Sequence, residues 1–211
     1  MTDTEQSLLA LLRRALFGQD TPLPPDADWQ SIFEEAASHS VHLLVYDCLT
    51  EQERAAIPKE TAALWRQEVL STMWYNEQLL GEQQEVLKAL SGLPCVILKG
   101  SSSAACYPRP ELRCAGDIDL LLFPADVKKA EAILCARGYC PPEDEHPFHR
   151  SMHREQFLVE LHFEPPGIPS GDSGAPLREY FRYAAGEGVL RGGLPVLPPE
   201  RQAVLLLLHK L

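Results

Sequence analysis

The sequence predicts a fold of the α/β type, more narrowly α+β, in which a small mixed β-sheet core with packed helices follows a helical region. Two observations predict it. Apolar residues recur at helical spacing through the first ninety residues. From Ser91 onward, short apolar runs bounded by Gly and Pro replace that period, as is typical of strands. We expect a helical region at 1–90, a sheet core at 91–165, and at 166–211 a loop-rich segment with the start of a C-terminal helical region.

Three helices are predicted in the first region, at 4–17, at 28–49 and from about 59 to 90. The first two are separated by GQDTPLPPDAD, a stretch rich in residues that break helices. Asp28 fits an N-cap for the second helix, whose apolar residues recur at helical spacing. The third helix is long enough to serve as a spine for this region.

The predicted core alternates strands and helices. We expect strands in LPCVILKG, DIDLLLF and REQFLVELHF, because each is a largely apolar run that ends at or near Gly or Pro. Between the first two strands we expect one or two helical turns at 101–106 and then a loop at YPRPEL. YPRPEL is predicted to be a loop because each of its two prolines lacks a backbone donor and restricts the residue before it. ADVKKAEAILCARGY predicts an amphipathic helix that Gly138 caps.

The last region is dense in Gly and Pro between residues 165 and 199, so we expect loops there with one short helix at 177–184. The tail PPERQAVLLLLHKL predicts a further helix, because Pro and Glu in the first turn precede an apolar run. Because the sequence stops while this helix continues, we expect the native chain to extend beyond Leu211.

Composition limits the class of protein. The chain has 211 residues, of which 45% are hydrophobic, enough for a sizeable core. No apolar run approaches the roughly 20 residues that span a bilayer, and Arg13 and Arg14 follow the first apolar residues, the reverse of a secretory signal. We therefore expect no membrane partner and a cytoplasmic location. Six scattered cysteines without a CxxC pair are predicted to be reduced thiols.

The formal net charge of −11 disfavours a long nucleic acid as the main partner, because counterion release on binding requires a basic surface. A small anionic ligand remains compatible with this charge if local cations meet it. Nothing in the sequence indicates an oligomeric state.

Three carboxylates fall on predicted strands: Asp117 and Asp119 on the second strand, and Glu160 on the third. Side chains alternate along a strand, so Asp117 and Asp119 share one face. Two carboxylates roughly 6 to 7 Å apart beside a core repel each other unless a cation or a hydrogen-bond network lies between them. If the two strands are neighbours, the three acids converge and can hold one or two Mg²⁺ ions for phosphoryl transfer. The alternative is a set of solvated acids on a partly exposed strand face.

A second motif, LKGSSS, precedes the acids at the end of the first predicted strand. Gly100 permits close approach of the backbone, and the serines from Ser101 open a short helix whose N–H groups and hydroxyls can hold a phosphate. An ordinary strand-to-helix turn capped by serine is the alternative. Lys99 and Arg113 are the nearest cations able to offset phosphate charge, although Lys99 can equally pair outward.

Two histidine features are less specific. His146, His149 and His153 in HPFHRSMHRE could hold a metal, but no Cys or acid completes the pattern, so a polar hairpin before the third strand is the favoured interpretation. His162 shares a strand face with Glu160. It can orient that acid, touch a nucleotide, or be a partly buried histidine with a backbone partner.

These motifs together resemble the DNA polymerase β superfamily of nucleotidyltransferases, with hG[GS] followed by [DE]h[DE]h and a later acid. More narrowly, VILKGSSSAACYPRPELRCAGDIDLLLFPADVKKAEAILCARGY and VELHF resemble a bacterial family of uncharacterised nucleotidyltransferases, through their LKG, YP, DIDLL, GY and E-L-H elements. The resemblance covers roughly residues 30–211, and residues 91–163 carry nearly all of its specificity. Fifteen residues separate Ser101 from Asp117, a longer gap than the superfamily usually has.

The resemblance implies a site and a reaction. Asp117 and Asp119 would bind two Mg²⁺ ions, Glu160 would be the third acid that helps activate an acceptor hydroxyl, and Gly100 with Ser101 would bind the β- and γ-phosphates of an NTP. An NMP group would pass to an unidentified acceptor, a small molecule or a protein, with release of pyrophosphate.

Two other functions stay open at this stage. The chain can be a non-catalytic regulatory module that keeps the fold and binds a nucleotide without turnover. It can also be a kinase-like phosphotransferase, which would form ADP instead of pyrophosphate.

Overall fold

The computed structural model describes residues 2–141 and 146–209. The chain divides into two compact units. The helical unit runs to Gln78 and also includes Ala104–Cys114, whereas the sheet unit contains Leu79–Ser103 and the chain from Ala115 onward. The change of unit thus falls inside the long third helix, earlier than the sequence-predicted change of region at residue 90, and the loop before the second strand belongs to the helical unit.

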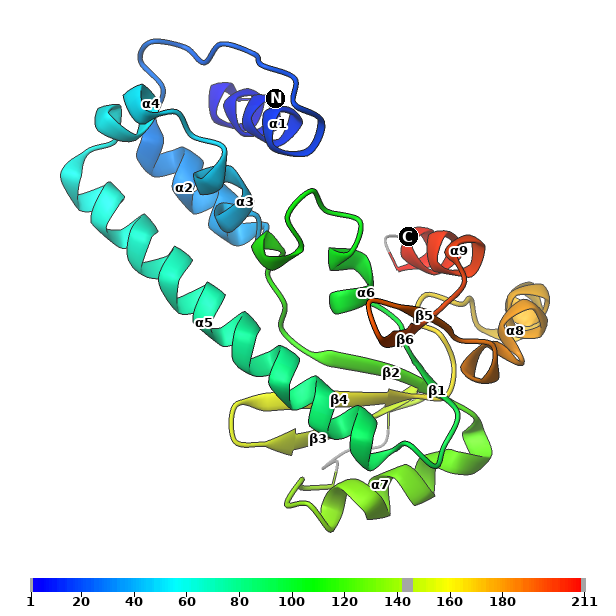
Figure 1. Ribbon diagram of the computed structural model, residues 1–211. Coiled ribbons are helices and arrows are strands. Elements are labelled where there is room, and N and C mark those ends of the chain that lie inside the picture. Colours follow the sequence, from blue (N-terminus) through cyan, green and yellow to red (C-terminus); the bar gives the residue numbers. More distant parts are fainter. Residues whose placement is uncertain (1, 142–145, 210–211) are drawn as a thin grey trace. The chain divides into compact units, whose positions relative to one another are not determined.

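The helical unit is built mainly from α1 (Asp3–Phe17), α2 (Trp29–Ser38), α3 (His42–Asp47), α4 (Glu51–Ala56) and the first part of α5 (Lys59–Ala89), with a 3₁₀ turn at Pro110–Leu112 (Figure 1). Thr2 and Glu5 form a capping box at the start of α1, which satisfies two backbone donors that the helix would otherwise leave unpaired. Gly18 ends α1 in the left-handed conformation that glycine adopts without strain. Local sequence therefore determines both ends of this helix.

The predicted helix at 28–49 is wrong as a single element. The chain leaves the helix at Ser40, which has a φ of 56°, and the N–H of Val41 donates to the carbonyl of Ala36 at 2.8 Å. This is the bond pattern of a helix end that normally uses glycine, so the sequence carries no glycine signal for it. Helix α4 was not predicted either, although Thr50 and Glu53 form a capping box at its start.

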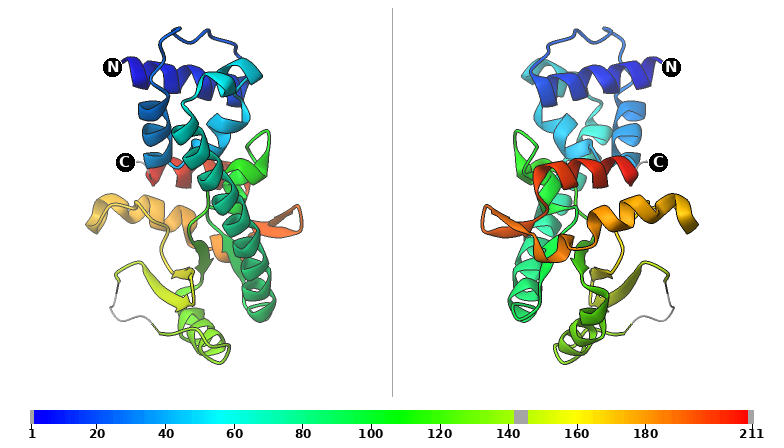
Figure 2. Two further views of the ribbon diagram at one scale, coloured as in Figure 1. Left: turned by 90° about the vertical axis from the view of Figure 1, so that its left-hand side faces the viewer. Right: turned by 90° about the vertical axis from the view of Figure 1, so that its right-hand side faces the viewer.

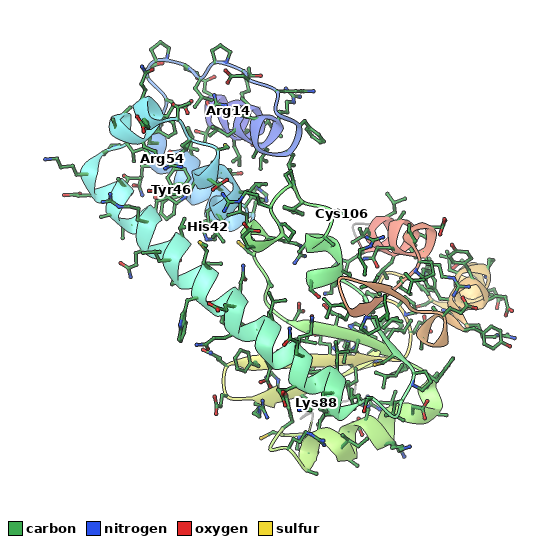
Figure 3. The ribbon with its side chains drawn as sticks, in the orientation of Figure 1. Arg14, His42, Tyr46, Arg54, Lys88 and Cys106 are labelled. Atoms are coloured by element: carbon green, nitrogen blue, oxygen red, sulfur yellow. The ribbon has the colours of Figure 1, made fainter. Side chains whose placement is uncertain are left out.

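Trp65 is the centre of the helical unit's core. Its side chain is fully buried, its ring lies 5.3 Å from Phe33 and 5.7 Å from Tyr46, and its indole N–H donates to the carbonyl of His42 at 3.0 Å. The hydrogen bond satisfies the one polar atom of a large apolar side chain, so its burial costs little. Arg54 covers the outer side of Tyr46, 5.1 Å from the ring (Figure 3).

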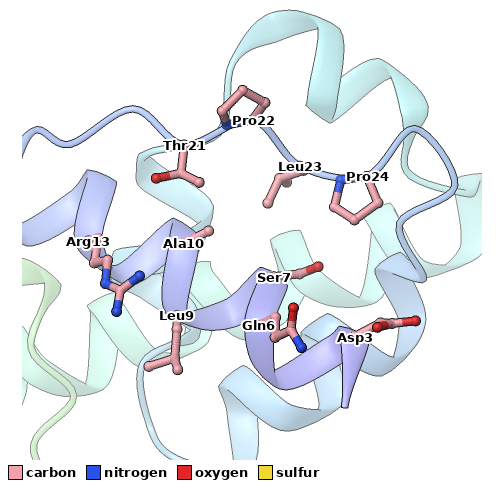
Figure 4. Close-up of a pocket in the computed structure, with 10 residues that line it drawn as sticks. All are labelled: Asp3, Gln6, Ser7, Leu9, Ala10, Arg13, Thr21, Pro22, Leu23 and Pro24. Atoms are coloured by element: carbon pink, nitrogen blue, oxygen red, sulfur yellow. The ribbon is translucent and has the colours of Figure 1, made fainter. Parts of the chain in front are cut away.

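A cavity of about 320 Å³ lies beside α1 in the same unit. The segment Thr21–Pro24 forms one wall, and α1 residues including Gln6 and Arg13 form the other (Figure 4). The two prolines in the wall have restricted backbones, so this segment crosses α1 without secondary structure of its own.

The sheet unit contains one mixed sheet of six strands among its described residues, in the order β3-β4-β2-β1-β6-β5. The strands are β1 (Cys95–Ile97), β2 (Ile118–Leu122), β3 (His149–Arg154), β4 (Phe157–His162), β5 (Val189–Arg191) and β6 (Leu194–Val196). The pairs β2–β4 and β1–β6 are parallel, whereas the other three pairs are antiparallel. The predicted α+β class with a small mixed sheet is confirmed.

Two details of the predicted strands need correction. Residues 165–199 are not all loop and helix, because β5 and β6 form a hairpin whose turn is Gly192 and Gly193, both at positive φ. Two glycines between short apolar runs are a hairpin signal that the high Gly and Pro content of the segment obscured. The predicted strand REQFLVELHF begins at Phe157, since Arg154 ends β3, and the polar hairpin predicted before it is the β3–β4 pair.

The two faces of the sheet have different coverings. Val96, Leu98 and Leu121 lie on one face and form a buried cluster with residues of α8 (Ala175–Phe181) and α9 (Pro199–Leu208). On the other face, α7 (Val127–Cys135) contacts β3 and β4. In two side views α7 lies on the opposite side of the strands from α8 and α9 (Figure 2).

The sheet unit also contains Ser101–Ser103 of the short helix α6 (Ser101–Ala104), and 3₁₀ turns at Pro124–Asp126, Gly171–Gly174 and Ala184–Gly186. All six cysteines lie within the described residues and are free thiols. Among the described residues, no helix combines the length and the apolar character needed to cross a membrane.

The second part of α5 is tied to the sheet by Glu82. This carboxylate is buried, accepts a hydrogen bond from the Tyr139 hydroxyl through one oxygen and pairs with the Arg154 guanidinium through the other. The Arg154 guanidinium also lies 4.8 Å from the centre of the Tyr139 ring. A charged side chain is accepted here because both of its oxygens have partners.

Leu120→Ala is expected to lower the free energy of unfolding of the sheet unit by about 3 kcal/mol, because Leu120 is fully buried at the centre of β2 and its loss leaves a cavity. Leu190→Ala is the matched control: Leu190 lies in edge strand β5 and is 77% exposed, so the change should be under about 0.5 kcal/mol. Urea unfolding of both variants measures the difference. Equal losses would contradict the assignment of the core.

Candidate functional site

The parallel pairing of β2 with β4 brings the three predicted acids together. Asp119 in β2 lies directly opposite Glu160 in β4. Asp117 immediately precedes β2 instead of lying in it, since the strand begins at Ile118. One carboxylate oxygen from each of the three residues can be chosen so that all lie within 4.8 Å of one another. The predicted adjacency of the two strands is therefore confirmed, and the acids form one cluster.

Asp119 is the most buried member of this cluster, with 1% of its surface exposed. Its Oδ1 atom has two cationic neighbours, whereas its Oδ2 atom is buried and has no hydrogen-bond partner among the described residues. A buried carboxylate oxygen without a partner is costly, because it has given up its water without a replacement. A bound cation could supply that replacement at this oxygen.

Lys99 balances part of the negative charge. Its Nζ atom lies 3.1 Å from Asp119 Oδ1 and 3.6 Å from Asp117 Oδ2. Burial lowers the pKa of Lys99, but the charges of Asp119 and Asp117 outweigh it and the net pKa is raised. Lys99 is therefore charged at neutral pH and directed at the acids, not outward as the alternative interpretation would have it.

His162 contacts both Asp119 on β2 and Glu160 on β4. Its Nε2 atom is 3.0 Å from Asp119 Oδ1 and 3.1 Å from Glu160 Oε2, and its side chain is 3% exposed. Burial lowers the pKa of His162, but the hydrogen bonds to Asp119 and Glu160 outweigh it, so the net pKa is raised. The sequence left three roles open for His162: orienting Glu160, touching a nucleotide, or bonding to the backbone. The structure shows contact with Glu160, and both partners of the His162 Nε2 atom are carboxylates instead of backbone groups.

The two aspartates respond differently to this environment. Burial, followed by the charge of Asp119, raises the pKa of Asp117. Burial also acts to raise the pKa of Asp119, but the hydrogen bond from His162 and the charge of Lys99 reverse the effect, so its net pKa is lowered. Asp119 thus stays ionised because of its partners, whereas the charge of Asp117 is poorly compensated.

The predicted phosphate loop lies at the end of β1. Gly100 has a φ of +68°, and a Cβ atom there would lie 3.7 Å from the carbonyl oxygen of Asp117, so the loop passes close to the start of β2. The Ser101 hydroxyl donates to Gln83 Oε1 in α5 at 2.8 Å. The Ser102 hydroxyl donates to the carbonyl of Leu98 at 3.2 Å. These bonds hold the serines in fixed positions beside the acids' strand.

Sequence reasoning missed two glutamines that support this loop. Gln83 is buried, and its amide nitrogen has no partner among the described residues. Gln202 in α9 donates to the carbonyl of Leu98 at 2.7 Å and to the Ser102 hydroxyl at 3.2 Å. Neither glutamine carries a local signal, because each approaches the loop from a helix far away in the sequence. Only the tertiary structure identifies them.

Arg113 and His149 complete the account of the predicted residues. Arg113 belongs to the helical unit, where its guanidinium donates to the carbonyl of Cys114 at 3.2 Å, so its role toward a phosphate stays a prediction. His149 lies on β3 with its Nε2 atom 3.6 Å from Glu160 Oε1. The spacing of histidines in the sequence identified His149 as a candidate ligand, but it did not indicate Glu160 on β4 as its partner.

A family model described as "Uncharacterised nucleotidyltransferase" matches residues 25–211, most of the chain and all of the acidic cluster. The chain belongs to this nucleotidyltransferase family. No curated protein and no solved structure matches it. Membership in the family implies nucleotidyl transfer as the general reaction and an NTP as the substrate class, and nucleotidyltransferases generally use a divalent metal ion, which the acidic cluster could hold.

Asp117→Asn and Asp119→Asn are expected to change the stability of the metal-free protein in opposite directions. The raised pKa of Asp117 means that its charge destabilises the fold near neutral pH, so Asp117→Asn should raise the free energy of unfolding, and this gain should shrink as the pH falls and Asp117 becomes protonated. The lowered pKa of Asp119 means that its charge stabilises the fold at neutral pH and that this contribution is lost as the pH falls. Asp119→Asn should therefore lower the free energy by about 2 kcal/mol.

Urea unfolding in the presence of a chelator, at neutral and at mildly acidic pH, measures both variants. A destabilised Asp117→Asn variant at neutral pH would show that Lys99 compensates Asp117 fully.

Proposed function

We propose that this member of the nucleotidyltransferase family is a Mg²⁺-dependent enzyme that transfers an NMP group from an NTP to a hydroxyl acceptor and releases pyrophosphate. The observation that carries the proposal is the pairing of Asp119 in β2 with Glu160 in β4, with Asp117 immediately before β2. Three carboxylates gathered on one sheet face are expensive unless they have a cationic ligand.

The donor set fits Mg²⁺. All three side chains offer oxygen, which hard divalent cations prefer, and the partnerless Oδ2 atom of Asp119 supplies a buried oxygen with a free lone pair. Asp117 and Asp119 would hold the ions, and Glu160 would complete the set. When bound, Mg²⁺ neutralises charge on the attacking and leaving oxygens of an in-line displacement at phosphorus.

Gly100 and Ser101 would bind the β- and γ-phosphates of the NTP. Gly100, at positive φ, carries no side chain that would keep a phosphate from the backbone. The Ser101 hydroxyl, which donates to Gln83 Oε1, would turn its hydrogen to a phosphate oxygen. Lys99 would offset phosphate charge by redistributing its contacts from the aspartates to the phosphates.

Glu160 would accept the proton of the attacking hydroxyl. His162 holds this carboxylate through Oε2, which restricts its rotation, and Glu160 keeps 17% of its side chain exposed, so an acceptor can reach it. The net charge of −11 favours a small molecule or a protein as the acceptor over a long RNA.

A second function has its own support. Lys99 and His162 lie within 3.1 Å of the most buried aspartate, so internal cations already compensate much of the negative charge. A regulatory module that binds a nucleotide without Mg²⁺ and without turnover fits this compensation. Isothermal titration of ATP, CTP, GTP and UTP with and without Mg²⁺ separates the two functions, because nucleotide binding that is independent of Mg²⁺ and unaffected by Asp117→Asn would support the module.

Asp117→Asn is expected to reduce the rate of pyrophosphate release more than about a hundredfold. Loss of a residue that only supports a metal ligand typically lowers activity roughly 10–100-fold, and loss of the ligand itself should cost more. The measurement is a pyrophosphate-release screen of the protein with each NTP, Mg²⁺ and a library of hydroxyl-bearing metabolites. Asp172→Asn is the matched control, because Asp172 is an exposed aspartate in a 3₁₀ turn of the same unit. Formation of ADP in place of pyrophosphate would instead identify a kinase-like phosphotransferase.

Ser101→Ala is expected to raise the KM for the NTP about tenfold, the value of one hydrogen bond to a charged group, with a smaller effect on kcat. Ser103→Ala is the control: Ser103 lies in the same short helix, is buried, and its hydroxyl has no partner within the described part of the chain. Steady-state kinetics with both variants tests the assignment. Equal KM values for Ser101→Ala and the unmodified protein would remove Ser101 from the phosphate site.

A further inference from the structure

A second group of potential metal ligands lies beside the acidic cluster, and it contains two histidines. The antiparallel pairing of β3 with β4 places His149 directly opposite His162, and Ser151 directly opposite Glu160. His149 Nε2 lies 3.6 Å from Glu160 Oε1, and His162 Nε2 lies 3.1 Å from Glu160 Oε2. One ligand atom from each of His149, Glu160 and His162 can be chosen so that all three lie within 4.8 Å of one another.

We propose that His149, Glu160 and His162 bind one divalent transition-metal ion, with Zn²⁺ as the best fit. Two imidazole nitrogens and one carboxylate oxygen are a donor set that Zn²⁺ prefers and Mg²⁺ does not. Two ligands that each lie about 2.0–2.1 Å from a tetrahedral ion are roughly 3.3 Å apart. Each histidine already lies close to this distance from one oxygen of Glu160, His149 from Oε1 and His162 from Oε2, so small shifts of the side chains would complete the site. Three protein ligands leave the fourth position of the ion open to water or substrate.

The position of His162 supports an ion at this place. Its Nε2 atom faces oxygens of both Asp119 and Glu160 at hydrogen-bond distance. An ion bound on Nε2 would bring positive charge to a nitrogen that faces two carboxylates.

The site is also accessible and partly preorganised. The side chains of His149 and Glu160 are 15% and 17% exposed, so an ion can enter from solvent. The ring of His146 stacks on His149 at 3.8 Å with an angle of 25° between the planes, which restricts rotation of the ligand ring. Fewer rotamers are then lost when the ion binds.

The ligand set differs from the histidine pattern in the sequence. His153 lies four residues beyond His149 on β3, about 13 Å along the strand; it pairs with Leu158 and is exposed. Only His149 of the three spaced histidines enters the site, and the other two ligands come from β4. Glu160 belongs to this group and to the aspartate cluster, but the His–Glu–His site requires neither an NTP nor the proposed reaction.

The test uses the full chain after treatment with a chelator. Co²⁺ is added as a spectroscopic probe, and Zn²⁺ affinity is measured by competition with a chromophoric chelator, in both cases without nucleotide. We expect one equivalent of Co²⁺ to give the visible d–d absorption of a four-coordinate site. His149→Ala should abolish this absorption and weaken Zn²⁺ binding at least about a hundredfold, because it removes a direct ligand.

His153→Ala is the matched control, since it removes an exposed histidine from the same strand, and its Zn²⁺ affinity should equal that of the unmodified protein. His149→Gln, which keeps a polar side chain, replaces His149→Ala if circular dichroism shows that the alanine variant is unfolded. The proposal is overturned if Co²⁺ gives no d–d absorption, or if His149→Ala and His153→Ala bind Zn²⁺ equally.

Asp117→Asn separates this site from the proposed reaction. Asp117 is outside the His–Glu–His group, so its variant should bind Zn²⁺ within a few-fold of the unmodified protein while losing pyrophosphate release. Tight Zn²⁺ binding in a protein without transferase activity would support the metal site and contradict the reaction, whereas the reverse result would contradict the metal site alone.

Discussion

The parallel pairing of β2 with β4 is the constraint on which the candidate site depends. Asp119 and Glu160 lie 41 positions apart in the sequence, yet the register sets them directly opposite each other. Ile118, Leu120 and Leu161 are almost fully buried in this pair of strands, so a slip of one residue would displace apolar side chains from their packing and separate the paired acids. Packing of the sheet therefore fixes the distance between the carboxylates.

Compensation of charge is the second theme of this unit. The cluster of Asp117, Asp119 and Glu160 is balanced from two sides, by Lys99 at the end of β1 and by His162 in β4. Each of these two side chains shares its contacts between two acids. The same arrangement accounts for the opposite pKa shifts of the two aspartates.

Distant segments support the loop that follows β1. Gln83 from α5 accepts from Ser101, and Gln202 from α9 binds Ser102 and the backbone at Leu98. The family model includes all of these segments, since it matches residues 25–211. The helices on either side of the core sequence thus contribute to the site's geometry as well as to the fold.

The sequence by itself determined the α+β class, most helix positions, the three acids and the Gly-Ser loop, because these depend on local signals: hydrophobic period, caps, breakers and residue chemistry. It did not reveal the break at Ser40, which lacks the usual glycine, or the β5–β6 hairpin within a segment read as loop. Only the tertiary structure decided that His149 lies beside Glu160 and that Gln83 holds Ser101. The physical reason is that strand register and helix packing are set by burial across the whole core, which no local stretch of sequence encodes.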